Sequence, residues 1–184
     1  MHKRAASSVL RRSAGFLLPC VLLFSCLTGK HAEGPAAGAL SPSDSTLLMH
    51  TFHNAAKEKN IGNYDAATSL FGQCIQIDRR NHAAMYELAR IYIKQDKPAT
   101  ALTYIKNAAL LDPENIWYQL MLADALDKNK QYTQAVAVYE HLLKKYPERV
   151  DYYFELASAL LHARKPYEAI RLYDRLEARI GISE

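Results

Sequence analysis

Small residues and helical hydrophobic patterns return along the chain with a period of 34 residues. Residues 82–115 contain two short helical patterns joined by a turn, and a shift of 34 residues in either direction places this segment on similar ones. Two alanine positions recur in four copies: Ala55, Ala89, Ala123 and Ala157 at the first, and Ala67, Ala101, Ala135 and Ala169 at the second. A fixed period of this size predicts a solenoid, in which each unit buries its apolar face only against its neighbours.

Turn residues interrupt the helical patterns at matching places. Within the units the breaks fall at residues 62–63, 96–98, 129–131 and 164–166. Between units, Pro113 and Pro147 end the second helical pattern, because proline is excluded from a helix interior. The period and the breaks together predict four units without insertions, at residues 48–81, 82–115, 116–149 and 150–183.

Each unit resembles a tetratricopeptide repeat, on the strength of the two recurrent alanines, the large residues that flank them and the placing of the turns. The resemblance implies an all-α fold: a right-handed α-solenoid of four tandem helix-turn-helix repeats, whose antiparallel helices cross closely where side chains are small. The sequence ends directly after the fourth unit, so we expect Leu172, Tyr173 and Leu176 to lie on an uncovered terminal face. Such a face is covered by another chain, packs without a cap, or is continued by further repeats, and the resemblance to long bacterial repeat lipoproteins favours a continued array.

The N-terminal segment has the three parts of an export signal. A basic start is followed by an apolar run over residues 14–24, which is shorter than the ~20 residues of a permanent membrane span. Leu23, Ser25 and Cys26 resemble a bacterial lipobox, although Phe24 departs from it, and an ordinary secretory signal with an incidental Cys26 is the alternative. Residues 1–25 are therefore predicted as a lipoprotein-type signal peptide, with lipid on Cys26, and residues 26–46, rich in Gly, Ala, Pro and Ser, as a flexible tether. Leu27 is not the Asp associated with inner-membrane retention, which favours an outer membrane lipoprotein facing the periplasm.

The charge of the chain is concentrated in that signal segment. The sequence pI is about 8.9, but Lys3, Arg4, Arg11 and Arg12 account for the formal net charge of +4. The remaining basic residues equal the 19 acidic ones, so the repeats lack the electrostatic footprint of a nucleic-acid-binding protein. Of the three cysteines, Cys74 lies at an interior repeat position and is expected to be a buried structural thiol.

Motifs for catalysis are missing from the sequence. It contains no phosphate-binding glycine loop, no HExxH, no CxxC and no serine nucleophile elbow. His50 and His53 could share a helix face, but two histidines without a third ligand make a poor metal site. The sequence therefore predicts a non-enzyme without cofactor, metal or small-molecule substrate.

In tetratricopeptide arrays the first helices of the repeats line a concave groove, which implies a groove in this chain. The groove residues that we predict from the repeat positions are Phe52, Tyr86, Arg90, Trp117, Leu120, Asp124, Phe154 and Ser158. Their apolar stripe suits an amphipathic helix or an extended peptide, and the alternative is that these residues are half-buried packing between adjacent helices. Arg90 and Asp124 are expected to pair across adjacent repeats. The Lys and Asn that grip a C-terminal carboxylate in related chaperone co-factors are absent from the groove positions.

The predicted function is a membrane-anchored scaffold for protein–protein interaction, with a peptide or amphipathic helix of another protein in the groove. Two alternatives stay open: an accessory factor for assembly or secretion in the cell envelope, and the recruiting front portion of a longer enzyme or sensor.

Overall fold

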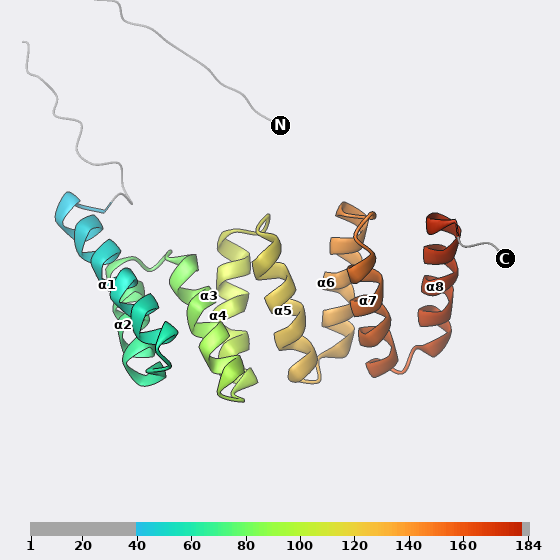
Figure 1. The fold of residues 1–184 in the computed structure, drawn as a ribbon, viewed down its shortest axis with the longest axis horizontal. Coiled ribbons are helices and arrows are strands. Elements are labelled where there is room, and N and C mark those ends of the chain that lie inside the picture. The colour runs from blue at the N-terminus through green and yellow to red at the C-terminus, as the bar shows by residue number, and fades with distance from the viewer. Residues whose placement is uncertain (1–39, 182–184) are drawn as a thin grey trace, which may run out of the picture. The chain divides into compact units, whose positions relative to one another are not determined.

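The computed structural model describes residues 40–181, which form helices joined by short turns. The predicted signal peptide, with its lipidation site Cys26, and residues 26–39 of the predicted tether lie outside the described part of the chain. The eight helices of the described part follow one another in chain order, as Figure 1 shows: α1 (Pro42–Asn60), α2 (Tyr64–Ile77), α3 (His82–Lys94), α4 (Pro98–Leu111), α5 (Ile116–Lys128), α6 (Tyr132–Lys145), α7 (Val150–His162) and α8 (Pro166–Ile180).

Each unit turns back on itself through the same hydrogen-bonded motif. The backbone N–H of Gln131 donates to the carbonyl of Leu126, and that of Lys130 donates to the carbonyl of Asp127, which closes the C-terminus of α5 as a Schellman motif. The left-handed residue that this motif requires recurs at intervals of 34 residues: Gly62, Asp96, Lys130 and Arg164, with φ of 84°, 56°, 59° and 59°. The turns therefore repeat with the period of the sequence, although only the first of them uses glycine.

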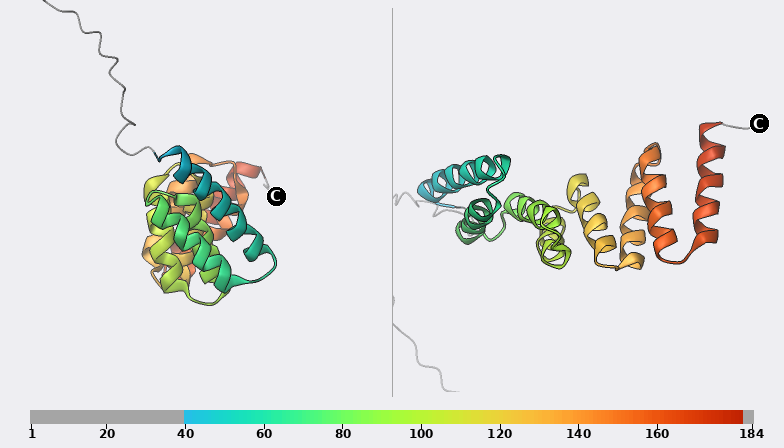
Figure 2. Two further views of the ribbon diagram at one scale, coloured as in Figure 1. Left: turned by 90° about the vertical axis from the view of Figure 1, so that its left-hand side faces the viewer. Right: turned by 60° about the horizontal axis from the view of Figure 1, so that its bottom comes forward.

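The helices pack as pairs and the pairs pack on one another. Within the units α1 contacts α2, α3 contacts α4, α5 contacts α6 and α7 contacts α8, while the second helix of each unit also contacts the first helix of the next. The right-hand view in Figure 2 shows the helices succeeding one another in chain order from α1 to α8. All eight recurrent alanines are at most 2% exposed, because only a methyl side chain lets the helix axes approach at these crossings. The predicted α-solenoid of helix pairs is confirmed.

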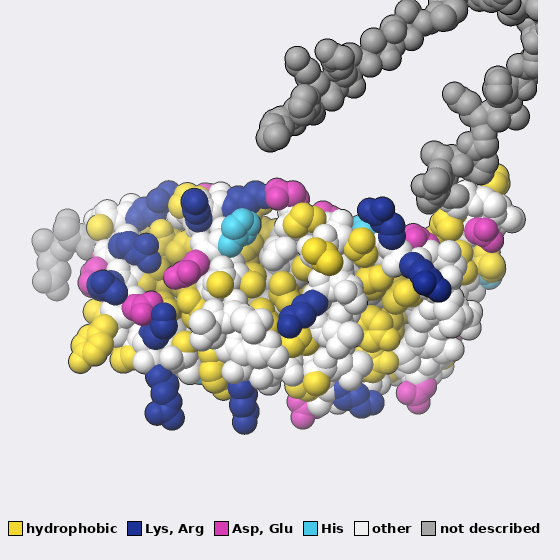
Figure 3. Space-filling model, turned by 180° about the vertical axis from the view of Figure 1, so that it is seen from behind, with side chains coloured by type: hydrophobic (Ala, Val, Ile, Leu, Met, Phe, Trp, Pro, Cys, Tyr) yellow, Lys and Arg dark blue, Asp and Glu magenta, His cyan; other side chains and the backbone are white. Residues whose placement is uncertain are grey.

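The core divides at α3, which packs on both sides. Ala84, Leu88 and Ile91 belong to a cluster with residues of α1 and α2, whereas Met85 and Ala89 belong to a larger cluster that continues through α8. Hydrophobic side chains also remain visible along the whole face seen from behind in Figure 3, since a layer two helices thick cannot bury every apolar residue. Apolar exposure alone therefore does not locate a binding site in this molecule.

The start of the first helix differs from the prediction. Helix α1 begins at Pro42, so residues 42–46 are helical, although they were assigned to the flexible tether. The Ser41 side chain accepts a hydrogen bond from the Asp44 backbone at 3.0 Å, Pro42 occupies the first helical turn, and Asp44 is favourably placed near the positive end of the helix dipole. These capping residues start the helix ahead of its first hydrophobic position.

The prediction that Leu172, Tyr173 and Leu176 lie together on an uncovered face of α8 is also wrong. Leu172 and Leu176 are 0% and 5% exposed, because the helix turns its apolar stripe toward the preceding helices, and only Tyr173 remains partly accessible. Arg171, Asp174 and Glu177 are exposed instead, together with Tyr167 and Ile170. Among the described residues no helix combines the length and apolar character that crossing a membrane requires.

Candidate binding groove

The first helices of the four units, α1, α3, α5 and α7, carry all the predicted groove residues. We call the side of these helices on which the predicted groove residues lie the helix-A face. The fifth position of each unit is aromatic or aliphatic, but its environment changes along the chain. Phe52 meets Phe71 edge-on with ring centroids 5.3 Å apart, and Tyr86 packs on Tyr118 at 5.0 Å. Leu120 is likewise partly buried against the core. Three of the four fifth-position residues, Phe52, Tyr86 and Leu120, are therefore half-buried and pack against neighbouring side chains.

The two aromatic residues Trp117 and Phe154 of the predicted groove set are mainly exposed to solvent. Phe154, the fourth member of the stripe, is 53% exposed and touches Tyr173 only loosely, at a centroid distance of 6.1 Å. Trp117 is 65% exposed at the start of α5, where the Asn115 side chain caps the helix by accepting from the Trp117 backbone. Ser158 is exposed one helical turn after Phe154. These side chains are available for contact with another molecule.

The prediction that Arg90 and Asp124 form an ion pair across adjacent repeats is wrong. Nη1 of Arg90 lies 3.3 Å from Oε1 of Glu87, and Oδ1 of Asp124 lies 3.0 Å from Nζ of Lys128. Each charge has an opposite partner one turn away on its own helix, so neither needs to reach across to the next repeat. The Arg90 guanidinium also lies over the Tyr86 ring, 5.7 Å from its centroid.

A basic cleft lies where the C-terminal ends of α1 and α3 meet. Its lining includes Lys59, Arg90 and Lys94, together with Tyr64 of α2. Glu87 is the carboxylate beside it, and its Oε2 accepts from Nζ of Lys59 at 2.7 Å. Lys94 lies over the Tyr64 ring and forms no ion pair with another described residue. Three cations and one carboxylate give this place a net charge of +2.

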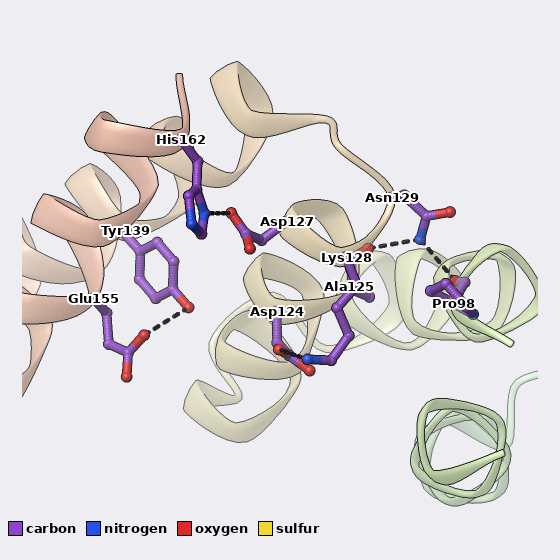
Figure 4. A network of polar contacts seen from close by, with 9 residues as sticks. All are labelled: Pro98, Asp124, Ala125, Asp127, Lys128, Asn129, Tyr139, Glu155 and His162. Carbon is purple, nitrogen blue, oxygen red and sulfur yellow. Dashed lines mark hydrogen bonds and ion pairs between the residues drawn. The ribbon is translucent and has the colours of Figure 1, made fainter. Parts of the chain in front are cut away.

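The equivalent place between α5 and α7 is acidic (Figure 4). Asp127 stands where the first cleft has Lys59, and its Oδ1 lies 2.8 Å from Nδ1 of His162. Glu155 stands where the first cleft has Glu87, and it accepts a 3.5 Å hydrogen bond from the Tyr139 hydroxyl. Burial and the nearby carboxylates, Glu155 first and then Asp124 and Asp127, raise the pKa of Tyr139 far above its ordinary value. The hydroxyl therefore stays protonated and remains a donor.

An apolar cleft lies at the other end of α1. It is lined mainly by side chains of α1, among them Leu48, Met49 and Phe52, and by Ala83 at the start of α3. Met49 is 70% exposed. This cleft extends the apolar part of the helix-A face to the beginning of the repeats.

Some of these residues were outside the predicted groove set. Glu87 and Glu155 follow the fifth position directly in the sequence, and Tyr139 comes from α6, a second helix, whereas the groove was predicted from first helices only. The sequence signals the role of Glu87 and Glu155 only through their register, since each comes directly after a residue already assigned to the groove, and it gives no such signal for Tyr139.

The candidate metal and thiol residues take ordinary structural roles. Nδ1 of His50 is hydrogen-bonded to the Asn54 side chain at 3.2 Å, and within residues 40–181 no group of three His, Cys, Asp or Glu is arranged for a metal ion. Cys74 is buried, as expected, and burial raises the pKa of its thiol.

Solved structures with the same fold include several forms of MamA. That of AMB-1 superposes with a TM-score of 0.66 at 17% identity, covering 74% of this chain and 75% of the other. MamA from Desulfovibrio magneticus RS-1, from residue 41 to its end, gives 0.64 at 15% identity, with 74% and 78% covered. The first tetratricopeptide domain of Spaghetti (RPAP3), bound to an HSP90 peptide, gives 0.58 at 20% identity, with 66% and 98% covered. At these identities the likeness shows the fold alone.

No curated protein matches the chain significantly. Two family models described as tetratricopeptide repeat match it, one over residues 62–106 and the other over residues 120–181, and together they take in more than half of the chain. The matched segments contain α2, α3, α6, α7 and α8 completely and parts of α4 and α5, with the turns and buried alanines that define their crossings. The chain belongs to the tetratricopeptide repeat family.

Proposed function

We propose that this chain is a scaffold that binds a segment of another protein on its helix-A face. The observation that carries the proposal is the succession of apolar side chains over the first helices of all four units, among which Trp117 and Phe154 are 65% and 53% exposed. Large aromatic side chains supply most of the energy of protein interfaces, and here two of them present more than half of their surface to solvent. The solved domain of Spaghetti (RPAP3) holds a peptide on the same fold, which supports a protein segment as the ligand.

The shape of the face suits a long partner better than a small one. The apolar cleft of α1, the half-buried stripe through Tyr86 and Leu120, and exposed Phe154 on α7 succeed one another over all four units. An amphipathic helix or an extended segment can contact several units at once, whereas a small molecule needs an enclosed pocket that buries most of its surface. Binding through this face would serve an envelope assembly factor or the recruiting portion of a longer enzyme equally well.

Site-specific crosslinking in the native cell tests the proposal. A photoreactive amino acid at position 117 is expected to capture a partner, and Phe154→Ser in the same chain should reduce that capture. Position 110 is the matched control, because Leu110 is 79% exposed but lies on α4, a second helix. Equal capture from positions 117 and 110, insensitive to Phe154→Ser, would place the binding surface elsewhere.

We propose further that Cys26 carries a lipid that anchors the repeats at the outer membrane, facing the periplasm. The support is the lipobox-like sequence from Leu23 to Cys26 and the Gly-, Ala-, Pro- and Ser-rich segment after it. Two acyl chains hold a protein at a bilayer stably, whereas a single chain binds only marginally. Radiolabelled palmitate should enter the wild-type protein and not Cys26→Ala, and equal labelling of both would overturn the anchor.

A further inference from the structure

We propose that the segment bound by the helix-A face is bipolar, with an acidic end held between α1 and α3, an apolar middle, and a basic end held between α5 and α7. This inference rests on the proposed function and adds the chemistry and the orientation of the partner. It follows from a comparison of equivalent places in successive units.

The charged positions of the helix-A face change sign along the chain. Each pair of neighbouring units forms an equivalent place from position 12 of the earlier unit and positions 9 and 13 of the later unit. In chain order these residues are Lys59, Arg90 and Lys94, then Ile93, Asp124 and Lys128, then Asp127, Ser158 and His162. Position 6 adds Glu87 to the first place, Met121 to the second and Glu155 to the third. The net charges are therefore +2, 0 and −2, with histidine neutral.

The charges at the two ends are not fully compensated within the molecule. Lys94 at the basic end faces the Tyr64 ring, and Glu155 at the acidic end receives only the long hydrogen bond from Tyr139. Neither forms an ion pair with another described residue, and both are exposed. A partner can thus place opposite charges at both ends without first breaking an internal pair.

Two cations also lie near the acidic end, but neither forms an ion pair with its carboxylates. Lys130 and Arg164 lie on the turns after α5 and α7, where they line a cleft with Tyr132 and His162 that adjoins the acidic end. Neither lies within ion-pair distance of Asp127 or Glu155. The acidic patch therefore belongs to the helices, while these cations belong to the edge formed by the turns.

The middle of the face is where the partner must be apolar. Between the two charged ends, Asp124 and Lys128 neutralise each other, and Ile93, Leu120 and Met121 are only partly buried. A segment with charges of opposite sign at its ends and an apolar centre matches this order. Such complementarity determines orientation and register more strongly than it determines total affinity.

Selection from a random library tests the inference, with peptides of about 20 residues, which reach about 30 Å as a helix. The full-length protein is the target, and only peptides whose binding is weakened by Phe154→Ser are retained as ligands of the helix-A face. These peptides are expected to be enriched in Asp and Glu at one end and in Lys and Arg at the other. Exchanging the two ends of a selected sequence should weaken its binding about tenfold, since several exposed charge pairs become repulsive.

The orientation of the bound peptide is measured with a nitroxide spin label attached to the acidic end of a selected peptide. It should broaden the amide resonances of α1 and α3 in the bound protein and leave those of α7 sharp. The preference for the selected charge order should be lost in the triple variant Lys59→Glu, Arg90→Glu, Lys94→Glu. The control is a second triple variant with the same change of net charge at other exposed positions, Lys57→Glu, Lys106→Glu, Lys144→Glu.

The outcomes separate the two proposals. Peptides that bind the helix-A face without a charge gradient, or with the nitroxide near α7, overturn the bipolar partner and leave the scaffold function standing. A selection that yields no peptide sensitive to Phe154→Ser overturns the proposed function itself, and the bipolar partner with it.

Discussion

The hydroxyl of Tyr118 lies 2.9 Å from Nδ1 of His82, one unit earlier in the chain. The equivalent residue of the next unit, Tyr152, is 1% exposed, and its buried hydroxyl has no hydrogen-bond partner among the described residues. The repeat register gives the reason, because the position equivalent to His82 is occupied there by Ile116. Two tyrosines at the same repeat position thus differ in whether their polar group is satisfied.

Phenylalanine at these positions should have opposite effects. Tyr118→Phe removes a satisfied hydrogen bond and is expected to lower the free energy of unfolding by about 1 kcal/mol. Tyr152→Phe removes a buried hydroxyl without a partner and should raise it by about 1 kcal/mol. Urea unfolding followed by circular dichroism measures both, and equal losses for the two variants would contradict the difference in hydrogen bonding.

Glycine in the turns should stabilise the repeats. Lys130 has a φ of 59°, a conformation that costs an L-residue roughly 1–2 kcal/mol and glycine almost nothing. After the entropy that glycine loses on folding, Lys130→Gly is expected to raise the free energy of unfolding by about 0.5 kcal/mol. Thr133→Gly, in the first turn of α6, should lower it, and stabilisation by both variants would mean that the backbone conformation is not the cause.

The buried helix crossing at Ala135 should not tolerate a larger side chain. Ala135 is 0% exposed between its packed helices, whereas Ala137 is exposed on the same helix. Ala135→Leu is expected to lower the free energy of unfolding by about 1–3 kcal/mol through overpacking, and Ala137→Leu should change it by less than about 0.5 kcal/mol. The melting temperatures of the two variants provide the comparison, and the same small shift in both would show that the crossing tolerates a larger side chain.

Alkaline pH should unfold the repeats cooperatively. Burial is the first cause of a raised pKa at five tyrosines: Tyr86, Tyr92, Tyr118, Tyr139 and Tyr152. The unfolded chain then loses protons near the ordinary value of 10.0 while the folded chain retains them, so stability is complete below pH 10.0 and falls as the pH rises further. Phenolate absorbance and helical ellipticity are expected to change together, and complete tyrosine ionisation with intact helices would contradict these pKa directions.

The register of the fold could be predicted from the sequence because it depends on local and repeated features. The buried alanines and the four turns are each determined within a few residues and recur with one period. The start of α1 was missed because Ser41, Pro42 and Asp44 initiate a helix by capping, before any hydrophobic residue marks it. The orientation of α8 was missed because Leu172 and Leu176 face inward through packing, which terminal position does not determine.

The candidate groove could be predicted only in part. Register assigned Trp117 and Phe154 to the helix-A face, where both are exposed. It could not decide which partner Arg90 selects, since Glu87 on the same helix and Asp124 on the first helix of the next unit were both candidates, and Glu87 takes the contact. Repeat register also gives the order of charges along the face, but which of these charges are paired within the molecule follows only from the packed side chains.

The central claim is tested most directly with the tightest-binding library peptide that is selected on the wild-type protein alone, before any sorting by Phe154→Ser, and is then titrated against matched variants. Phe154 and Ile170 are 53% and 57% exposed, on a first and a second helix of the same unit. In a fluorescence anisotropy titration, Phe154→Ser should weaken binding about tenfold, the effect of losing an apolar contact of one side chain, while Ile170→Ser leaves it unchanged. Unchanged binding by Phe154→Ser, or a loss confined to Ile170→Ser, would contradict a partner site on the helix-A face.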